Sequence, residues 1–318
     1  MLEKLKIKIF NYYMNLLVSN RILKNIDIEI TNRCNLFCKH CYMNATNSQK
    51  EETIKTEEWK IFIDNIYNKF WNKITLSFTW WEALVRKDIF EILNYAKNLG
   101  FKMTLVTNWT LLNKEKITKL WNLLSTIAIS IDWLEKEHNN LRWWEVFNLT
   151  IENIKLIKKY SNLPIVIKTV IWKNNYVNID LIYELIKEIN PCVWNLFPIE
   201  PIWRWAELKK NTLTKKEYID LCDFIDKIKK ENKWPKIIFS EQNSNFLKTK
   251  DYYKIRKNMW WIEYFTVLSN WNIVKHLEEN RDIVYWNIKT DNILDVWNIN
   301  IKNSLNDNSI REPYYINL

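Results

Sequence analysis

Three cysteines that lie close together are the residues best suited to carry chemistry. Cys34, Cys38 and Cys41 occur in the run CNLFCKHCY, so one short segment offers three thiolates. Iron–sulfur clusters are usually held by four cysteines, and a cluster on three would keep one iron open, as catalytic metal sites do. His40 would allow a zinc site, but zinc ligands of this kind usually come as two separated pairs. The spacing therefore favours an iron–sulfur cluster.

The balance of glycine and tryptophan is unusual. The chain has one glycine, Gly100, and 19 tryptophans, whereas about 7% of an average protein is glycine. Trp271 follows an asparagine between two apolar runs, where Asn-Gly would predict a hairpin, and Trp121 follows an expected helix as Gly100 does. We interpret most of these tryptophans as UGA codons, which some bacterial lineages read as glycine. Three tryptophans lie in apolar patterns and are expected to be genuine: Trp59, Trp194 and Trp297.

Two further motifs complete a resemblance to the radical S-adenosylmethionine (SAM) superfamily. Residues 79–84 (TWWEAL) become TGGEAL when glycine replaces tryptophan, which resembles the glycine-glycine-glutamate motif of that family. Residues 130–133 (SIDW), followed by Arg142, resemble a pattern of its SPASM-type branch, and so does the cysteine run. The motifs agree in order and spacing, and such consistency is stronger than any one of them.

The resemblance implies a [4Fe–4S] cluster and SAM as cofactors. The implied metal ligands are Cys34, Cys38 and Cys41. The implied SAM-binding residues are Tyr42, Trp80, Trp81, Glu82, Ser130 and Arg142. Tyr42 would lie beside the adenine and Glu82 near the amino group. Ser130 and Arg142 would contact the carboxylate, which a guanidinium grips well. At positions 80 and 81 the family needs bare backbone, so indole side chains there would fill the pocket.

Strand-like and helical patterns alternate over the first two thirds of the chain and would position these motifs. The expected strands are Asp27–Thr31, Lys73–Thr79, Lys102–Asn108, Thr126–Asp132, Ile165–Ile171 and Val193–Pro198. The expected helices are Glu57–Phe70, Lys87–Leu99, Lys114–Leu120, Val146–Tyr160, Asn178–Ile189 and Lys215–Lys230. Six β–α units predict an α/β fold with a parallel sheet, and the resemblance implies a partial (βα)6 TIM-like barrel. Functional groups of such barrels gather at the carboxyl ends of the strands, where the motifs fall.

The pattern divides the chain into three regions. The pattern predicts an N-terminal helical extension over residues 1–23, and the resemblance implies that residues 24–231 form the radical SAM core barrel. Residues 232–318 predict a small α+β appendage that resembles a SPASM or twitch domain. No cysteine follows Cys222, so we expect the appendage to bind no cluster of its own.

Composition narrows the candidate partners. The net charge of +10 is spread along the chain as lysine, with no basic–aromatic motif, so nucleic-acid binding is not favoured. No apolar run approaches the roughly 20 residues of a membrane span. Five cysteines, three of them clustered, fit a reducing cytoplasm better than a disulfide framework.

The resemblance implies an enzyme that cleaves SAM reductively to a 5′-deoxyadenosyl radical, which abstracts hydrogen from a substrate. Its electrons would come from a donor such as flavodoxin or ferredoxin. A peptide or protein and a small molecule are both candidate substrates, and the sequence assigns no catalytic side chain. The alternative is a non-catalytic Fe–S electron-transfer or sensing protein on the same fold.

Overall fold

The computed structural model describes residues 24–41, 54–142, 145–199, 211–231, 235–239, 264–274 and 286–287. Three expectations lie outside these residues: the N-terminal helical extension, Tyr42 beside the adenine, and Trp297 as a core residue. Most of the expected appendage also lies outside them.

The described strands form one sheet with the order β10-β9-β8-β1-β2-β3-β4-β5-β6-β7. The strands are β1 (Asn25–Ile28), β2 (Thr75–Phe78), β3 (Lys102–Thr107), β4 (Thr126–Ser130), β5 (Ile165–Ile171), β6 (Val193–Pro198), β7 (Lys236–Phe239), β8 (Tyr264–Val267), β9 (Asn272–Val274) and β10 (Trp286–Asn287). Strands β8 and β1 to β7 run parallel, whereas β9 and β10 pair antiparallel. This arrangement confirms the α/β partial barrel.

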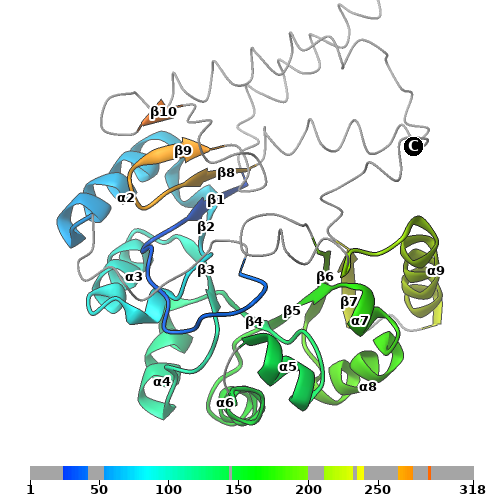
Figure 1. The fold of residues 1–318 in the computed structure, drawn as a ribbon. Helices are drawn as coiled ribbons and strands as arrows, with labels where there is room; N and C mark the ends of the chain where they lie inside the picture. The colour runs from blue at the N-terminus through cyan, green and yellow to red at the C-terminus, as the bar shows by residue number, and fades with distance from the viewer. Residues whose placement is uncertain are drawn as a thin grey trace, which may run out of the picture.

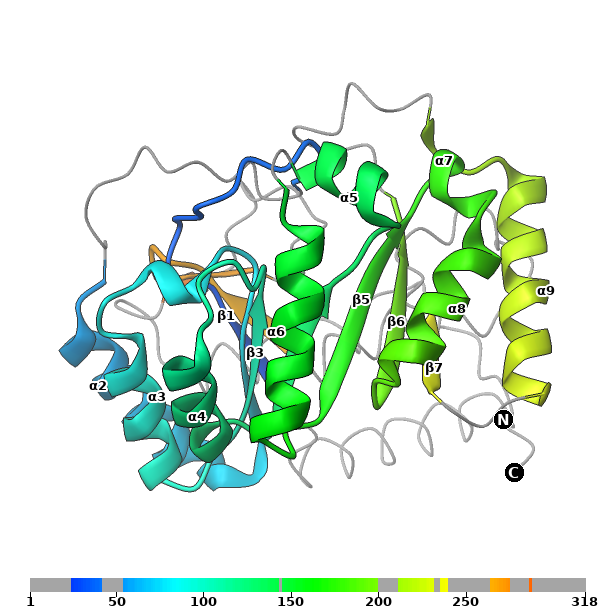
Figure 2. The same cartoon turned by 90° about the horizontal axis from the view of Figure 1, so that it is seen from below.

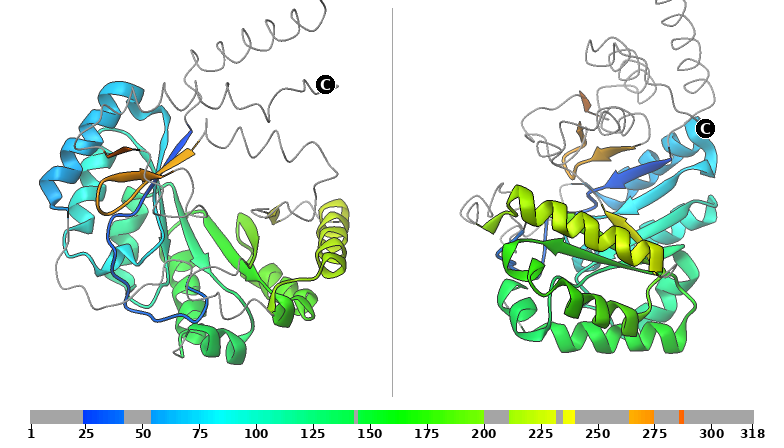
Figure 3. Two further views of the ribbon diagram at one scale, coloured as in Figure 1. Left: turned by 45° about the horizontal axis from the view of Figure 1, so that its top comes forward. Right: turned by 90° about the vertical axis from the view of Figure 1, so that its right-hand side faces the viewer.

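Helices cover the outer face of the curved sheet (Figures 1 and 3). They are α2 (Thr56–Phe70), α3 (Ile89–Asn98), α4 (Lys114–Leu123), α5 (Glu135–Arg142), α6 (Phe147–Tyr160), α7 (Lys173–Tyr176), α8 (Ile179–Ile189) and α9 (Lys215–Glu231), with short 3-10 turns η1 (Trp71–Lys73) and η2 (Ala83–Val85). Alternate strand residues such as Ile26, Ile28 and Leu105 are fully buried on this side, while Asp27 and Ser77 share the inner face. Among the described helices, none has the length and apolar character needed to cross a membrane.

Strands β7 and β8 join the barrel sheet, although the sequence analysis assigned their residues to the appendage. β7 follows α9 and pairs parallel with β6, so α9 is the crossover of a further β–α–β unit. β8 pairs parallel with β1, with Ile26 opposite Phe265. The sheet therefore extends on both sides of the six predicted strands.

Tryptophan occupies backbone conformations that normally favour glycine. Non-glycine residues with positive φ in the described chain are Trp71 (56°), Trp80 (89°), Trp109 (72°), Asn190 (48°) and Trp271 (70°), beside Gly100 (82°). A left-handed conformation costs a residue with a Cβ roughly 1–2 kcal/mol. Trp271 thus has the turn conformation expected at a glycine position, whereas Trp121 does not follow a helix as expected, because α4 continues through it. Trp59 and Trp194 are fully buried core residues, as expected.

Candidate functional site

The cysteine segment follows β1 and crosses the carboxyl ends of the strands, beside α5 (Figure 2). Its backbone joins α5 through a hydrogen bond from Lys39 N to Leu141 O of 2.8 Å. Cys34 is buried, and Cys38 and Cys41 are half-buried and pack in the same apolar cluster. The structure therefore brings the three predicted metal ligands together at the expected end of the barrel.

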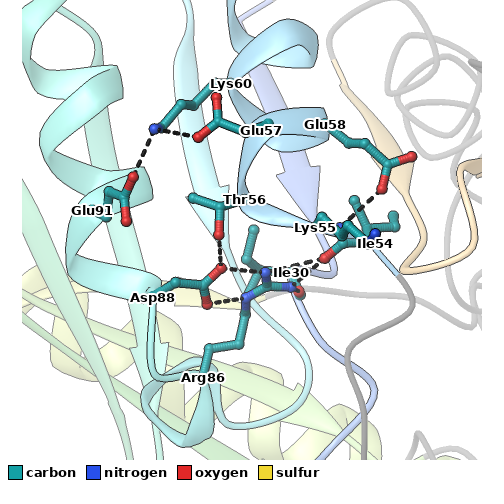
Figure 4. Close-up of polar contacts among 10 residues, drawn as sticks. All are labelled: Ile30, Ile54, Lys55, Thr56, Glu57, Glu58, Lys60, Arg86, Asp88 and Glu91. Carbon is teal, nitrogen blue, oxygen red and sulfur yellow. Dashed lines mark hydrogen bonds and ion pairs between the residues drawn. The ribbon is translucent and has the colours of Figure 1, made fainter.

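Arg86, which the sequence analysis did not single out, binds the backbone on both sides of the cysteine segment (Figure 4). Its Nη1 donates to the carbonyl of Ile30 at 2.9 Å and to that of Ile54 at 3.1 Å. Asp88 holds the guanidinium through Nε (2.8 Å) and Nη2 (2.7 Å) and accepts a hydrogen bond from Thr56. Ile30 precedes the cysteines and Ile54 follows them, so one buried guanidinium fastens both ends of the segment.

Glu82 joins the ends of β2 and β3. Its fully buried carboxylate accepts hydrogen bonds from the Thr107 hydroxyl (2.9 Å), Asn108 N (2.7 Å) and Leu84 N (3.0 Å). Burial raises the pKa of Glu82 to about 7, although these hydrogen bonds oppose the shift. The carboxylate is engaged by protein groups, and its contact with SAM stays a prediction.

Trp80 and Trp81 lie against the cysteines. Trp81 packs in the apolar cluster of Cys34 and Cys38, and both indoles pack with Cys41 and Leu268. The buried Trp81 Nε1 has no hydrogen-bond partner among the described residues, and such a buried donor costs about 1–3 kcal/mol. Indoles thus fill the place where the resemblance implies bare backbone.

Asp132, after β4, is the centre of a buried charged group. Its Oδ2 accepts from Nε (3.0 Å) and Nη2 (2.7 Å) of Arg142 and lies 3.3 Å from His40 Nε2, while Oδ1 accepts from Val170 N. Burial alone would raise the pKa of Asp132, but the charge of Arg142 holds it well below its usual range. His138 Nδ1 accepts from Asp132 N, and burial lowers the pKa of His138 to about 3.

Arg142 and Ser130, the predicted contacts of the SAM carboxylate, lie at the same end of the sheet. Arg142 uses Nε and Nη2 on Asp132, and no described residue accepts a hydrogen bond from its Nη1. Ser130 is half-buried, and its hydroxyl has no hydrogen bond within the described part of the chain. One guanidinium nitrogen and one hydroxyl are therefore available to a ligand.

Charged side chains also lie on the inner face of the barrel. Lys168 of β5 is in register with Ser130 of β4, and no carboxylate of the described chain pairs with it within 4.0 Å. Loss of hydration lowers the pKa of Lys168 and raises that of Asp27, on β1, to about 6. Asn25 donates to Asp27 at 2.7 Å. The inner face of the barrel thus carries charged and polar side chains beside apolar ones such as Ala128 and Val166.

Three further polar or thiol side chains, those of Asn175, Cys192 and Cys222, have structural positions. Asn175 is fully buried and donates to the carbonyls of Asp132 and Val170, so it shapes a turn. Cys192 precedes β6, at the other end of the sheet, and its thiol contacts Ile165 O. Cys222 packs against the apolar core from α9.

The donor set fits a cluster better than a single ion. One short segment supplies three thiols, and each cysteine of a cubane binds its own iron. Among the described residues no group of three His, Cys, Asp or Glu side chains is placed to hold a metal ion. Burial, reinforced by the charge of Glu82, raises the pKa of the Cys34 thiol to about 12. A buried sulfur of this kind becomes a thiolate when a metal cation coordinates it.

Comparisons with known proteins identify the family. Residues 28–189, just over half of the chain, match the radical SAM superfamily. An AdoMet-dependent heme synthase of Methanosarcina barkeri is 31% identical over 208 residues, which are 64% of this chain and 58% of the relative. An Fe-coproporphyrin III synthase of the same organism is 30% identical over 162 residues, which are 50% and 40% of the two chains. The chain thus spans little more than half of the first relative.

A solved structure shows the same fold. Streptococcus suis SuiB bound to S-adenosylmethionine matches with a TM-score of 0.69 and 17% identity, covering 87% of this chain and 66% of SuiB. The family match and the fold agree. The protein belongs to the radical SAM superfamily, a family whose enzymes use a [4Fe–4S] cluster and SAM.

Proposed function

We propose that Cys34, Cys38 and Cys41 hold the [4Fe–4S] cluster and that SAM binds beside it at the carboxyl ends of β2 to β4. The observation that carries this proposal is the packing of the three cysteine side chains in one cluster at that end of the barrel. When bound, the cluster and SAM supply reductive cleavage to a 5′-deoxyadenosyl radical that abstracts hydrogen from the substrate. The protein's part is to hold, orient and shield these groups.

The chain's own residues divide this work. Ser130 and the Nη1 group of Arg142 receive the SAM carboxylate, while Asp132 fixes the guanidinium and neutralises its charge. Glu82 fixes the end of β3 beside the site and, together with the backbone at positions 80 and 81, receives the SAM amino group. The resemblance assigns Tyr42, which is outside the described residues, to the adenine. These roles follow from the motif resemblance, and the described surroundings of Ser130 and Arg142 leave a hydroxyl and a guanidinium nitrogen for the carboxylate.

The tryptophans at positions 71, 80, 81, 109, 133 and 271 are, in this proposal, glycines of the native protein encoded by UGA. Positive φ at Trp71, Trp80, Trp109 and Trp271 supports this reading. The buried indole N–H groups of Trp81, Trp109 and Trp271 have no acceptor among the described residues, but neither has that of Trp59, so this feature alone does not distinguish glycine positions. By contrast, the indole of Trp194 donates to Thr169 at 2.9 Å, as a genuine core tryptophan would. The coding DNA decides the point: UGG at these positions would contradict it.

The substrate that best suits the barrel interior is a carboxylate-bearing small molecule. Lys168 offers a positive charge on the inner face, in register with Ser130. Two relatives carry the names of heme and Fe-coproporphyrin III synthases, and porphyrins of this kind bear carboxylates. Binding of Fe-coproporphyrin III should change its absorbance spectrum, and Lys168→Met should weaken that binding. A weak absorbance change that Lys168→Met does not alter would direct the search to peptides, the other candidate.

The protein also needs an electron donor. A flavodoxin or ferredoxin is the donor we infer, because an acidic carrier would complement the net charge of +10. Three cluster thiols must stay reduced, which favours a reducing cytoplasm.

Incubation with SAM and dithionite tests the function. The reconstituted protein with glycine at the UGA positions should release 5′-deoxyadenosine. If the protein has an intact cluster but releases no 5′-deoxyadenosine, and its spectrum does not change on addition of SAM, the non-catalytic electron-transfer or sensing alternative would be favoured.

A further inference from the structure

Asn108, directly after β3, aims its side-chain amino group at the first cysteine. Asn108 Nδ2 lies 3.7 Å from Cys34 Sγ and 2.8 Å from Asn35 Oδ1. Thr110 donates to Asn108 Oδ1 from both its backbone N (3.1 Å) and its hydroxyl (2.8 Å). A backbone N–H can only donate, so the carbonyl of Asn108 must face Thr110 and its amino group must face the sulfur.

The donor is fixed from three sides. The backbone N of Asn108 donates to the buried Glu82 carboxylate at 2.7 Å. Asn35 Nδ2 in turn donates to Thr110 Oγ1 at 2.6 Å, which closes a ring of hydrogen bonds between the cysteine segment and the end of β3. Movement of the amide away from Cys34 would therefore break several hydrogen bonds at once.

A fixed donor at a ligand sulfur has an electronic consequence. Hydrogen bonds to the sulfurs help to set the reduction potential of an iron–sulfur cluster. They stabilise the reduced cluster more than the oxidised one, because reduction adds negative charge. Leu36 N supplies a second donor to the same sulfur at 3.5 Å, so Asn108 provides one part of the effect.

We propose that Asn108 is a positioning residue that holds Cys34 and raises the reduction potential of the cluster through a hydrogen bond to its sulfur. This inference rests on the proposed role of Cys34 as a cluster ligand. It gives the segment Thr-Asn-Trp-Thr, residues 107–110, a function toward the cluster.

A redox titration followed by electron paramagnetic resonance (EPR) tests it on the reconstituted protein. Asn108→Leu and Asn108→Ala remove the donor and should lower the potential, so that the ratio of reduced to oxidised cluster falls about tenfold at a fixed solution potential, or about 59 mV. Thr110→Val removes the hydroxyl from the ring but keeps the donor and the backbone N–H of Thr110 that orients it, so its potential should lie closer to the wild type than those of the Asn108 variants. Equal potentials in wild type and Asn108→Leu, with full cluster content, would overturn the inference.

Two outcomes separate this inference from the proposed function. A wild-type protein that binds no cluster would contradict the assignment of Cys34 itself. If both Asn108 variants lose the cluster, pulsed EPR of the wild type labelled with ¹⁵N in the asparagine side chains replaces them. A coupling between that nitrogen and the reduced cluster supports the inference, and its absence overturns it.

Discussion

His40 and Asp132 join the cysteine segment to the end of β4: His40 Nε2 lies 3.3 Å from Asp132 Oδ2. The same oxygen accepts Arg142 Nη2 at 2.7 Å. The Asp132 carboxylate therefore holds two residues at once. One is His40, which lies between two predicted cluster ligands in the sequence, and the other is Arg142, which is predicted to face SAM. Buried ion pairs are weak evidence for stability, but removing one partner leaves a costly unpaired charge.

We expect Asp132→Asn to destabilise the fold strongly. Arg142 would stay buried without its counter-charge, which costs about 3–5 kcal/mol of unfolding free energy. Urea unfolding measures the change. Asp226→Asn, at an exposed position of α9, is the matched control and should stay within about 0.5 kcal/mol of wild type. Equal losses in the two variants would contradict the account.

Acid should destabilise the protein through His138. Its folded-state pKa of about 3 lies below the unfolded value of about 6.5. The neutral buried ring therefore contributes stability that is complete above about pH 6.5 and is lost as the pH falls toward 3, at up to about 1.4 kcal/mol per pH unit. His138→Asn cannot titrate, so its unfolding free energy should fall less steeply between about pH 7 and 5. Parallel curves for the two proteins would refute this role.

Arg86→Lys should weaken the contacts that hold the two ends of the cysteine segment, at Ile30 and Ile54. A lysine cannot contact Asp88 and the carbonyls of Ile30 and Ile54 together, and each lost hydrogen bond to a charged group costs about 1.5–3 kcal/mol. We expect less iron per chain after reconstitution. Lys60→Gln removes the exposed ion pairs to Glu57 and Glu91 (Figure 4) and should leave the iron content unchanged. A fully loaded Arg86→Lys protein would argue against the clamp.

Glycine at positions 80 and 81 should create the SAM pocket. The double variant Trp80→Gly/Trp81→Gly removes the two indoles that pack on Cys41 and relieves the positive φ of Trp80. We expect SAM affinity at least about tenfold higher than that of the tryptophan form, measured from the change that SAM causes in the EPR spectrum. Trp59→Gly, in the core, should instead cost at least about 3–5 kcal/mol of stability. Tighter SAM binding by the tryptophan form would sink the UGA interpretation.

Local sequence patterns predicted the elements that bury one regular face. α2, α6 and α8 lie within one or two residues of their expected bounds, because their apolar residues recur at helical spacing. α5 was missed, since Glu135–Arg142 contains one strongly apolar residue, Leu141. Trp121 was misplaced because the predicted helix ended at Leu120, although the helical spacing of Ile117, Leu120 and Leu123 carries α4 through it.

Contacts between distant segments could not be predicted. The pairing of β8 with β1 and the clamp from Arg86 to Ile54 depend on the assembled sheet, and the signal at Arg86 was only the nearby Asp88. The cysteine triplet was different, because its three ligands are neighbours in the sequence. The candidate site was therefore predictable at its metal ligands, and the residues that support them were found in the structure.

Iron analysis and EPR of the anaerobically reconstituted protein test the central claim most directly. The account predicts about four iron atoms per chain and a [4Fe–4S] spectrum. Substitution of Cys34, Cys38 or Cys41 by alanine should abolish both, whereas Cys192→Ala and Cys222→Ala should retain them. Zinc in place of iron, or a cluster that survives loss of any of the three, would contradict it.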